Sequence, residues 1–546
     1  MTSIIETPRS QATLGLALGI ASHWAYFIHG EHHLQAPRLL LLACLGPIGL
    51  VAWLSIGAQV SVTAAIGTSS WFFCSFFAGL FASIVTYRLF FHQLRRFPGP
   101  RLARISKLYH AYRCGQTNNY QILADLHQTY GPIVRVGPNE LSVLHPAAVL
   151  AIYGNQSQCK KATWYDMGHP TKSLHQSRDV VAHAQRRKIW DKGFSMKALR
   201  DFEHRVHIYL KQLDETIYAG KGKAVNVSQL FNFFSFDVMG DLAFGASFDM
   251  LKDNKEHFVM QILHEGQQHL SWLIPIPWVG LILRALPGVL ESERRFLKWC
   301  MDQVEKRRKI TMENPDVMTW LLGAESNAQG RPWGDHWLAG DSRLIIVAGS
   351  DTTAVTLAYM FQYLARYPEQ VEKLRLALDP ILSGADQVQD SQLQKVEELN
   401  GFIHEVLRMH PPVPAGLLRI TPPEGIEVDG IHIPGGCTVS VPSQPIGRAE
   451  TAYKDANQFI PERWYSRPEL ILDKSAFSPF SLGRYSCIGK NFAYMELRTV
   501  TALLVHKYDV RFAPNEDGSR LMKEDQDAFT LFVKELNLVF TERKHD

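Results

Sequence analysis

The feature that most constrains this chain is a run of 49 residues, Leu39–Tyr87, that contains no Asp, Glu, Lys or Arg. About 20 residues of helix cross a bilayer core, so this run has room for two transmembrane helices, which we place at residues 39–57 and 71–91. A third and weaker candidate covers residues 11–29, for which a cleaved signal peptide is the competing interpretation. Residues 1–97 are therefore predicted to form a membrane anchor with two to three transmembrane helices.

The arginines beside these segments predict the orientation of the chain. Arg38 lies between the first two candidates, and Arg88, Arg95 and Arg96 surround the end of the last one. Short basic segments stay on the cytosolic side, so everything after Arg95 is predicted to face the cytosol. The two prolines of FPGP (97–100) indicate a stiff hinge between the anchor and a second unit, residues 98–546.

Residues 98–546 are mostly helical in pattern. Apolar periodicity predicts long helices near five stretches: 195–217, 296–310, 337–367, 392–409 and 490–505. Strand-like alternation is confined to two short segments, PIVRVGPNELSVL and GIEVDGIHIPGGCTVSV. The pattern favours a large, mainly α unit with a few small β-sheets over a doubly wound fold.

Charge and cysteine content exclude several classes of protein. The net charge is +4, and no long Lys/Arg run interleaves with aromatic residues, so nucleic acid is not an expected partner. Seven cysteines at wide spacings include no C-x-x-C pair. Neither a zinc ribbon nor a disulfide framework is therefore expected.

One cysteine stands at a position suited to chemistry. Cys487 lies in FSLGRYSCIG (480–489), just before a predicted helix, where the helix N-terminus is expected to lower the pKa of its thiol. Gly489 leaves room for a flat group beside the sulfur, Gly483 supplies a turn, and Phe480 can shield one side. A thiolate that binds a metal in a dry site is one interpretation, and a buried structural cysteine is the other.

A polar insertion interrupts the apolar helix LIIVAGSDTTAVTLAYMF (344–361). The Thr352 hydroxyl can bond to the carbonyl of Ala348 one turn earlier and bend the helix. An acid, Asp351, beside an alcohol at such a kink is suited to proton relay. Ordinary helix packing with satisfied polar groups is the alternative interpretation.

Four motifs occur in a fixed order: AGSDTT (348–353), E-x-x-R (405–408), PERW (461–464) and the cysteine loop (480–489). This order, the anchor followed by FPGP, and the stretch HAQRRKIWDKGFS (183–195) resemble the cytochrome P-450 family. These are the haem-thiolate monooxygenases, and the likeness is to microsomal, fungal-type members. The resemblance covers essentially all of residues 98–546 and implies the family's mainly α fold with small β-sheets.

The resemblance implies a role for each matching residue. Cys487 would be the axial thiolate ligand of the iron in haem b, which favours O–O cleavage. Asp351 and Thr352 would deliver protons to bound dioxygen. A structural ion triad that holds the cysteine loop would comprise Glu405, Arg408 and Arg463. The other haem-contacting positions would be Phe480, Gly483, Arg484, Tyr485 and Gly489, with His183, Arg187 and Arg419 as propionate partners and Arg186 as an alternative to Arg187.

The cysteine loop departs from the family pattern F-x-x-G-x-R-x-C-x-G at one position. Tyr485 stands where the family has arginine, and Arg484 lies one residue earlier. Either Arg484 reaches the haem propionate, or Tyr485 donates a hydrogen bond and another arginine supplies the charge. The sequence leaves both possibilities open.

The resemblance also implies partners and a location. The chain has no flavin or nicotinamide motif, so a separate NADPH–cytochrome P-450 reductase would supply electrons, with cytochrome b5 as an optional donor. Arg484 and Lys490 are hypothesised to attract its acidic surface, although simple solvated charges explain them equally well. The expected location is the endoplasmic reticulum membrane, with the catalytic domain in the cytosol.

The expected reaction is oxidation, foremost hydroxylation, of a lipophilic small molecule in fungal secondary metabolism, of terpenoid, polyketide or indole type. Isomerisation, ring formation or dehydration at the same haem is the alternative outcome. Two remote alternatives are a non-catalytic haem sensor and a membrane di-iron hydroxylase. The latter is suggested by the H-x-x-H-H box formed by His29, His32 and His33.

Overall fold

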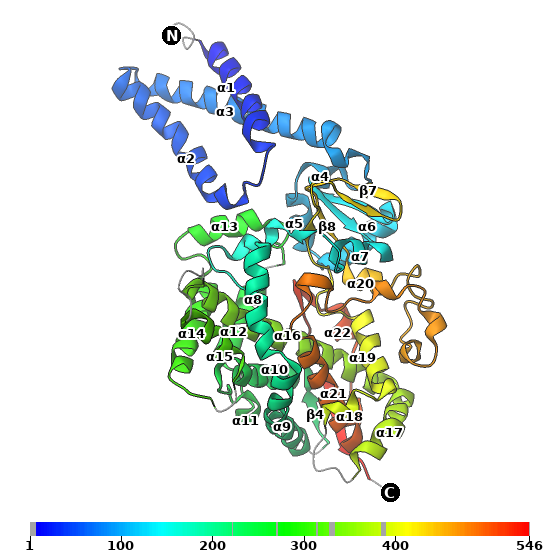
Figure 1. Cartoon of the computed structure of the whole chain (residues 1–546). Coiled ribbons are helices and arrows are strands. Elements are labelled where there is room, and N and C mark those ends of the chain that lie inside the picture. Colours follow the sequence, from blue (N-terminus) through cyan, green and yellow to red (C-terminus); the bar gives the residue numbers. More distant parts are fainter. Residues whose placement is uncertain are drawn as a thin grey trace.

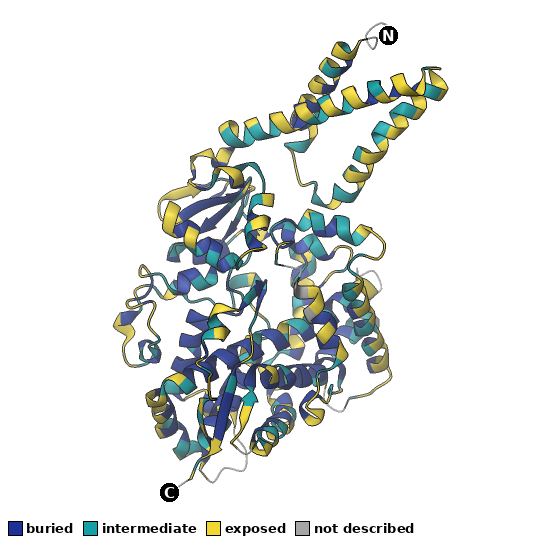
Figure 2. Cartoon of the chain, turned by 180° about the vertical axis from the view of Figure 1, so that it is seen from behind, coloured by how far each residue is buried: buried dark blue, intermediate teal, exposed yellow. Residues whose placement is uncertain are grey.

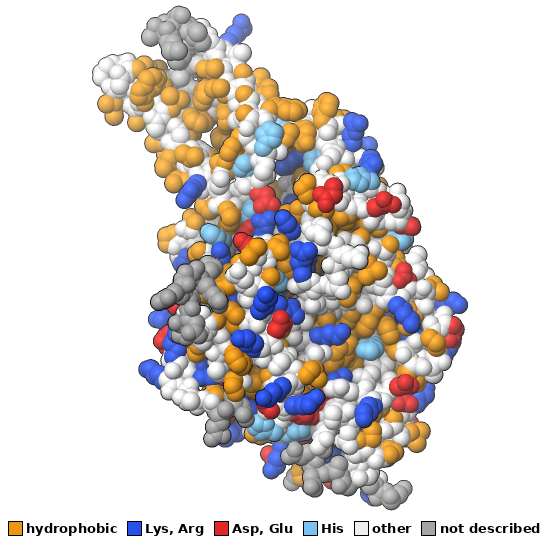
Figure 3. Space-filling view, viewed as in Figure 1, with side chains coloured by type: hydrophobic (Ala, Val, Ile, Leu, Met, Phe, Trp, Pro, Cys, Tyr) orange, Lys and Arg blue, Asp and Glu red, His pale blue; other side chains and the backbone are white. Residues whose placement is uncertain are grey.

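The computed structural model describes residues 7–220, 222–268, 271–312, 315–326, 333–383 and 389–544. Three anchor helices project from one end of a larger body (Figure 1). They are α1 (Pro8–Ser22), α2 (Ala36–Ala52) and α3 (Val62–Thr86), each continued by a short π-helical turn. Figure 2 shows buried residues concentrated in the body, and hydrophobic side chains cover the anchor in Figure 3.

The body is mainly helical, as predicted. Its α-helices are α4 (Arg101–Ile105), α5 (Leu108–Cys114), α6 (Asn119–Tyr130), α7 (Pro146–Tyr153), α8 (Val180–Gly193), α9 (Met196–Ala219), α10 (Val227–Phe244), α11 (Met250–Asp253), α12 (Phe258–Gln268), α13 (Pro277–Ala285), α14 (Glu291–Arg308), α15 (Val317–Ser326), α16 (Asp335–Arg366), α17 (Pro368–Leu382), α18 (Asp390–Leu393), α19 (Glu397–Met409), α20 (Ser443–Gly447), α21 (Lys490–Lys507) and α22 (Ser519–Lys523).

The strands are short and form small sheets, also as predicted. They are β1 (Ile133–Gly137), β2 (Glu140–Val143), β3 (Lys160–Lys161), β4 (Ala224–Asn226), β5 (Arg419–Ile420), β6 (Ile426–Val428), β7 (Ile431–Ile433), β8 (Thr438–Ser440), β9 (Tyr508–Phe512), β10 (Gln526–Ala528), β11 (Thr530–Phe532) and β12 (Asn537–Glu542). The largest sheet has the order β1-β2-β8-β5-β3. Its edge pair β3–β5 sets Lys161 directly opposite Arg419.

Helices α2 and α3, with the turns that continue them, are long and apolar enough to cross a membrane, in agreement with the segments 39–57 and 71–91. Helix α16 meets the same criterion by length and composition, yet 72% of its most apolar window is buried. It packs against α10 and α14 in the body, so it is a core helix. Helix α1, which overlaps the third candidate span, is not among the helices that meet the criterion.

Glycines let α1 and α3 pack closely. A methyl group added at Gly15 or Gly19 would collide with the carbonyl oxygens of Phe72 and Phe76, and one at Gly79 would collide with that of Leu16. Small residues at such spacing allow two membrane helices to approach backbone to backbone. His23, in the π-turn that continues α1, reinforces the contact, because its Nδ1 lies 2.8 Å from the Ser83 hydroxyl on α3.

One of the predicted long helices begins later than expected. The stretch 392–409 is divided between α18 and α19, and α19 begins only at Glu397. Val396 precedes it in an extended conformation, and the Asn400 amide donates to the carbonyls of Leu393 and Val396. This side-chain bonding to the backbone explains the break between the two helices.

Candidate functional site

The cysteine loop joins a single turn of 3-10 helix, η11 (Gly483–Tyr485), to helix α21. The Cys487 N–H donates to the Phe480 carbonyl oxygen at 2.8 Å, which closes the loop on itself. Gly483 has φ +63°, and a Cβ there would lie 2.7 Å from the carbonyl oxygen of Tyr153. The turn therefore requires glycine for its backbone conformation as well as for space.

Cys487 is surrounded by many protein atoms, yet part of it remains accessible. Cys487 is exposed, although burial is the largest influence on its thiol and raises the pKa above the ordinary value. The N–H groups of Gly489 and Lys490 and the charge of Arg187 oppose this rise. The expectation of a lowered pKa is wrong in direction. The thiol borders open space inside the protein.

Gly489 lies beside the sulfur. A Cβ added at Gly489 would be at ordinary contact distance from Cys487 Sγ, at 3.9 Å, and from a ring carbon of Phe194, at 4.0 Å. No neighbour in the described structure therefore demands glycine here on steric grounds. That Gly489 leaves room for a flat group against the sulfur stays a prediction.

Helix α16 carries a strip of accessible residues on an otherwise buried element. Ala348 is exposed and Thr352 is half-buried, one turn apart on the same face. The Thr352 hydroxyl donates to the Ala348 carbonyl oxygen at 2.8 Å, the bond expected from the sequence. Asp351 beside it is buried. An acid and an alcohol thus occupy the middle of α16 next to accessible space.

The three residues proposed as a structural triad lie together, fully buried. The Glu405 carboxylate accepts from Arg408 Nε at 2.8 Å and Nη2 at 2.7 Å, and from Arg463 Nε at 3.0 Å. It also accepts from Trp464 Nε1 at 2.9 Å and from the Ile460 N–H at 2.8 Å. The two arginines in turn donate to backbone carbonyls of residues 447–470. The carboxylate therefore fastens α19 to the segment that precedes the cysteine loop.

Arg484 and Tyr485, the two residues that the sequence left unresolved, have different surroundings. Arg484 is exposed, and its Nη2 donates to the Ser157 carbonyl oxygen at 3.1 Å. Tyr485 is half-buried, and its hydroxyl is buried with no hydrogen-bond partner in the described structure. Its ring lies 5.0 Å from the Arg419 guanidinium and 4.8 Å from the His183 ring. Tyr485 therefore joins a buried basic cluster, and the exposed Arg484 lies at its edge, with its guanidinium 6.0 Å from the centroid of the Tyr485 ring.

Arg186 and Arg187, which are neighbours on α8, also have different partners. Arg187 Nη1 donates to the Ser486 carbonyl oxygen at 2.7 Å, directly before the cysteine. Arg186 is fully buried, and its Nε pairs with Asp341 at 2.7 Å. Arg187 therefore contacts the cysteine loop, whereas Arg186 is paired with a residue of α16.

Two residues beside this site were missed by sequence reasoning. Lys161 is buried, and its ammonium lies 4.8 Å from the centroid of the Tyr485 ring. Glu496, on α21, is fully buried and accepts from the Thr353 hydroxyl at 3.2 Å. Burial raises the pKa of Glu496 well above its ordinary value and so favours its protonated form. One indirect signal for Lys161 is present in the sequence: arginine is missing at position 485, so another cation is needed nearby.

A second hollow lies between the large sheet and α13. Its volume is about 90 Å³, and its lining includes Trp164, Ile274, Leu418, Asp527 and Phe529. The Trp164 and Phe529 rings stack at 4.6 Å. Burial raises the pKa of Asp527 to about 7, so this wall carries a proton near neutral pH.

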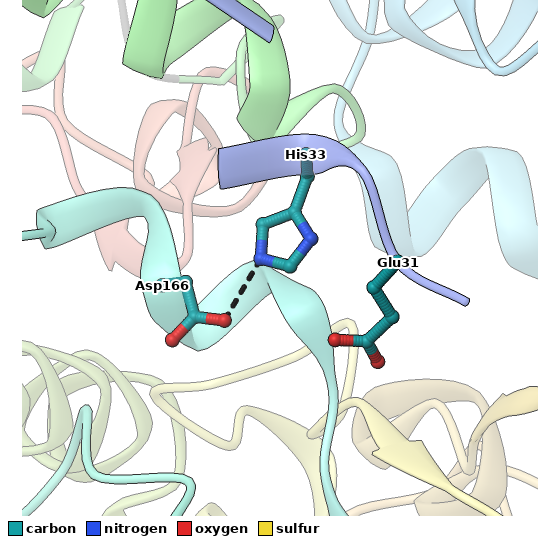
Figure 4. Close-up of side chains that lie close together, drawn as sticks. All are labelled: Glu31, His33 and Asp166. Carbon is teal, nitrogen blue, oxygen red and sulfur yellow. Dashed lines mark hydrogen bonds and ion pairs between the residues drawn. The ribbon is translucent and has the colours of Figure 1, made fainter. Parts of the chain in front are cut away.

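The histidines of the H-x-x-H-H box do not converge on a metal. His29 Nε2 and His32 Nε2 lie 3.1 Å from the carbonyl oxygens of Trp24 and Tyr26, and His33 Nε2 lies 2.8 Å from Asp166. Figure 4 shows His33 directed at Asp166, with Glu31 nearby. The three groups are close enough for a cation, but Arg178 bonds to both carboxylates. The cluster is an ion-pair network that joins the anchor to the body.

The basic cluster and the cysteine loop together suit haem. An accessible thiol, the glycine beside it and the Tyr485 hydroxyl without a partner in the described structure would provide an axial ligand, a small neighbour for a planar ring and a donor for its edge. Arg419 is buried and makes no salt bridge in the described ranges, so an anionic edge would compensate its charge. The residues present fit the group that the sequence motifs imply.

Comparisons with known proteins agree with this geometry. The profile of the family named Cytochrome P450 matches residues 98–540. Tryprostatin B 6-hydroxylase of Aspergillus fumigatus is 42% identical, over 97% of this chain and 96% of that protein. Cytochrome P450 monooxygenase notG' of Aspergillus versicolor is 42% identical, over 99% and 100%. The crystal structure of the cytochrome P450DA heme domain aligns with a TM-score of 0.68 at 17% identity, over 82% of this chain and 98% of that one. The chain belongs to the cytochrome P450 family of haem-thiolate monooxygenases.

Proposed function

We propose that this enzyme hydroxylates a lipophilic small molecule of fungal secondary metabolism, using electrons from an NADPH-dependent reductase. The observation that carries the proposal is the accessible Cys487 thiol just before α21, in a chain of the monooxygenase family whose core helix α16 carries an acid and an alcohol beside the accessible Ala348. Haem with a thiolate ligand supplies the electron density that favours cleavage of dioxygen. Cys487 holds the iron, and its loop is fastened by the Glu405 network.

The residues of α16 move protons in this proposal. Thr352 keeps its hydroxyl on the accessible strip through its bond to Ala348, where it can pass a proton to an acceptor in the pocket. Asp351 lies beside it and feeds that proton from the protein interior. Glu496 bonds to Thr353 next to this relay, and burial raises its pKa, which favours the form without negative charge.

The hollow beside the sheet supports an apolar, ring-containing substrate. Trp164 and Phe529 present stacked aromatic faces, and Ile274 and Leu418 add aliphatic surface. Asp527 and nearby polar groups would orient the molecule through a few hydrogen bonds. The printed name of one relative, a 6-hydroxylase, supports insertion of a hydroxyl group at one fixed position of such a substrate.

Electrons would arrive at the face that holds Cys487. Arg484 and Lys490 are exposed on either side of it and offer positive charge to an acidic reductase surface, with cytochrome b5 as an optional second donor. Reversal of the charge at Lys490 should slow reduction at low ionic strength. An unchanged rate at low salt would remove Lys490 from the docking surface.

The test of the reaction combines substrate discovery with isotope labelling. Metabolites that accumulate in a deletion strain would be supplied to the purified enzyme with reductase, NADPH and labelled dioxygen. Hydroxylation predicts one labelled oxygen atom in the product, and no product from Cys487→Ala. A product without label would replace hydroxylation by isomerisation, ring formation or dehydration at the same haem.

We further propose that the anchor crosses the endoplasmic reticulum membrane three times, with the body in the cytosol. The 15 residues of α1 and the five of its π-turn give about 30 Å of helix, the thickness of a bilayer core. The network of Glu31, His33 and Asp166 supports placing the loop after α1 beside the body, and hence the N-terminus on the opposite side. A glycosylation tag at the N-terminus should be modified and the same tag at the C-terminus should not. An unmodified N-terminal tag would leave two spans.

A further inference from the structure

Lys161 is a buried lysine beside the cysteine loop whose ammonium makes no salt bridge in the part of the chain that the structure describes. We propose that Lys161 binds a propionate of the haem and supplies the positive charge that position 485 lacks. The proposal rests on haem binding, which family membership establishes. It does not depend on the substrate, on the reductase or on the reaction that is catalysed.

The hydrogen bonds of Lys161 leave one proton available. Its Nζ donates to the carbonyl oxygens of Leu174 at 2.9 Å and His175 at 2.7 Å. An ammonium carries three protons, so a third acceptor can be bound. The same nitrogen lies 4.8 Å from the centroid of the Tyr485 ring and 5.4 Å from that of Tyr165. The ammonium therefore stands next to the residue that replaces the family's arginine.

The β3–β5 ladder forces two like charges together. Lys161 and Arg419 are directly opposite each other, and their exposures are only 4% and 2%. Like charges at opposite positions of a ladder destabilise a sheet, and burial increases that penalty. Burial and the charge of Arg419 lower the pKa of Lys161 well below its ordinary value. Such a pair becomes favourable when an anion binds between or beside the two cations.

No carboxylate of the described chain supplies that anion. Asp341 is the acid bonded to the same segment, since it accepts from the Leu174 N–H at 2.8 Å, but Arg186 already pairs with it. His183 does not add a third cation, because burial lowers its pKa to about 3. Arg187 and Arg484 lie nearby but are less buried, so the two cations buried in the β3–β5 ladder, Lys161 and Arg419, match in number the two propionates of a haem.

The loop residues fit a shift of the positive charge from position 485 of the loop to Lys161 of strand β3. Arg484 is exposed at the edge of the cluster, 6.0 Å from the centroid of the Tyr485 ring, and its Nη2 already donates to the Ser157 carbonyl oxygen, whereas Lys161 is buried within the cluster. The Tyr485 hydroxyl is buried without a partner and can donate to the same carboxylate, but it brings no charge. Strand β3 thus provides, through Lys161, what the loop provides in the family's usual pattern.

The experiment compares haem retention in four full-length holoproteins: wild type, Lys161→Met, Lys160→Met, and Lys161→Met combined with Tyr485→Arg. Lys160 is the matched control, because it lies on the same strand and is exposed. The rate of haem transfer to apomyoglobin and the reduction potential of the iron are measured without substrate. Loss of one charge-assisted hydrogen bond predicts about tenfold faster transfer from Lys161→Met, and a more negative potential because a nearby cation is lost.

The double variant separates a propionate contact from a structural one. Arginine at position 485 restores the charge without restoring the bonds to Leu174 and His175, so transfer should return to within about threefold of wild type. Equal rates for Lys161→Met and Lys160→Met would overturn the proposal. If Lys161→Met does not fold, a folded double variant that holds haem supports the proposal. Failure of both variants to fold would make Lys161 a purely structural residue and overturn it.

Discussion

The substitution Glu405→Gln tests whether the buried triad holds the cysteine loop. It preserves the size of the side chain but removes the charge that neutralises Arg408 and Arg463, both of which are buried. The carboxylate accepts five hydrogen bonds from these arginines, Trp464 and Ile460. In glutamine an NH2 group replaces one of the two oxygens, and this group cannot accept the hydrogen bonds that the oxygen accepted. Breaking a buried ion pair lowers stability by about 3–5 kcal/mol. That is a large part of the roughly 5–15 kcal/mol that stabilises a typical domain.

The assay is urea unfolding of the holoprotein followed by haem absorbance, with Glu397→Gln as the control. Glu397 is in the first turn of the same helix and is exposed, so its substitution should change the free energy of unfolding by no more than about 0.5 kcal/mol. Glu405→Gln should lower it by about 3 kcal/mol or more and release haem in the same transition. A decrease below about 1 kcal/mol would refute the assignment of the triad to loop support.

Three further predictions follow from the site and the anchor. Thr352→Val should lower product formed per NADPH consumed by about tenfold or more, whereas Thr216→Val, which removes a similar hydroxyl-to-backbone bond on α9, should leave that ratio unchanged. Because burial raises the pKa of Asp527 from 3.8 to about 7, the folded protein retains a proton that the unfolded chain releases, so stability should fall as the pH rises from about 4 to about 7. Asp527→Asn should flatten that pH dependence of the unfolding midpoint. Asp166→Asn removes the carboxylate that His33 and Arg178 share, so amide hydrogen exchange in residues 28–35 should accelerate; unchanged exchange would mean that the network does not hold the loop.

Local motifs made the helical fold and much of the site predictable. The cysteine loop, the polar insertion in α16 and the E-x-x-R helix each consist of residues close in sequence, so their spacing already defines their geometry. The pairing of Glu405 with Arg408 and the bond from Thr352 to Ala348 are of this kind. The absence of charge over residues 39–87 likewise sufficed to locate two apolar helices.

Contacts across long stretches of chain were not predictable in this way. Lys161 meets Arg419 and Tyr485 only because β3 pairs with β5, and a two-residue strand leaves no periodic signal. Glu496 was not singled out in the sequence, because its burial and its contact with Thr353 depend on how α21 packs against α16. The pKa of Cys487 was misjudged because a helix N-terminus can be read from sequence, whereas the depth of burial cannot.

The ion-pair network of Glu31, His33, Asp166 and Arg178 connects the anchor to a second part of the body. Asp166 belongs to the 3-10 turn η7 (Thr163–Gly168), and the same turn contributes Thr163 and Trp164 to the wall of the hollow beside α13. The contact of His33 with Asp166 therefore links the anchor to that wall. Replacing the anchor by a generic single helix would release η7 from His33, and with it one restraint on the position of Trp164.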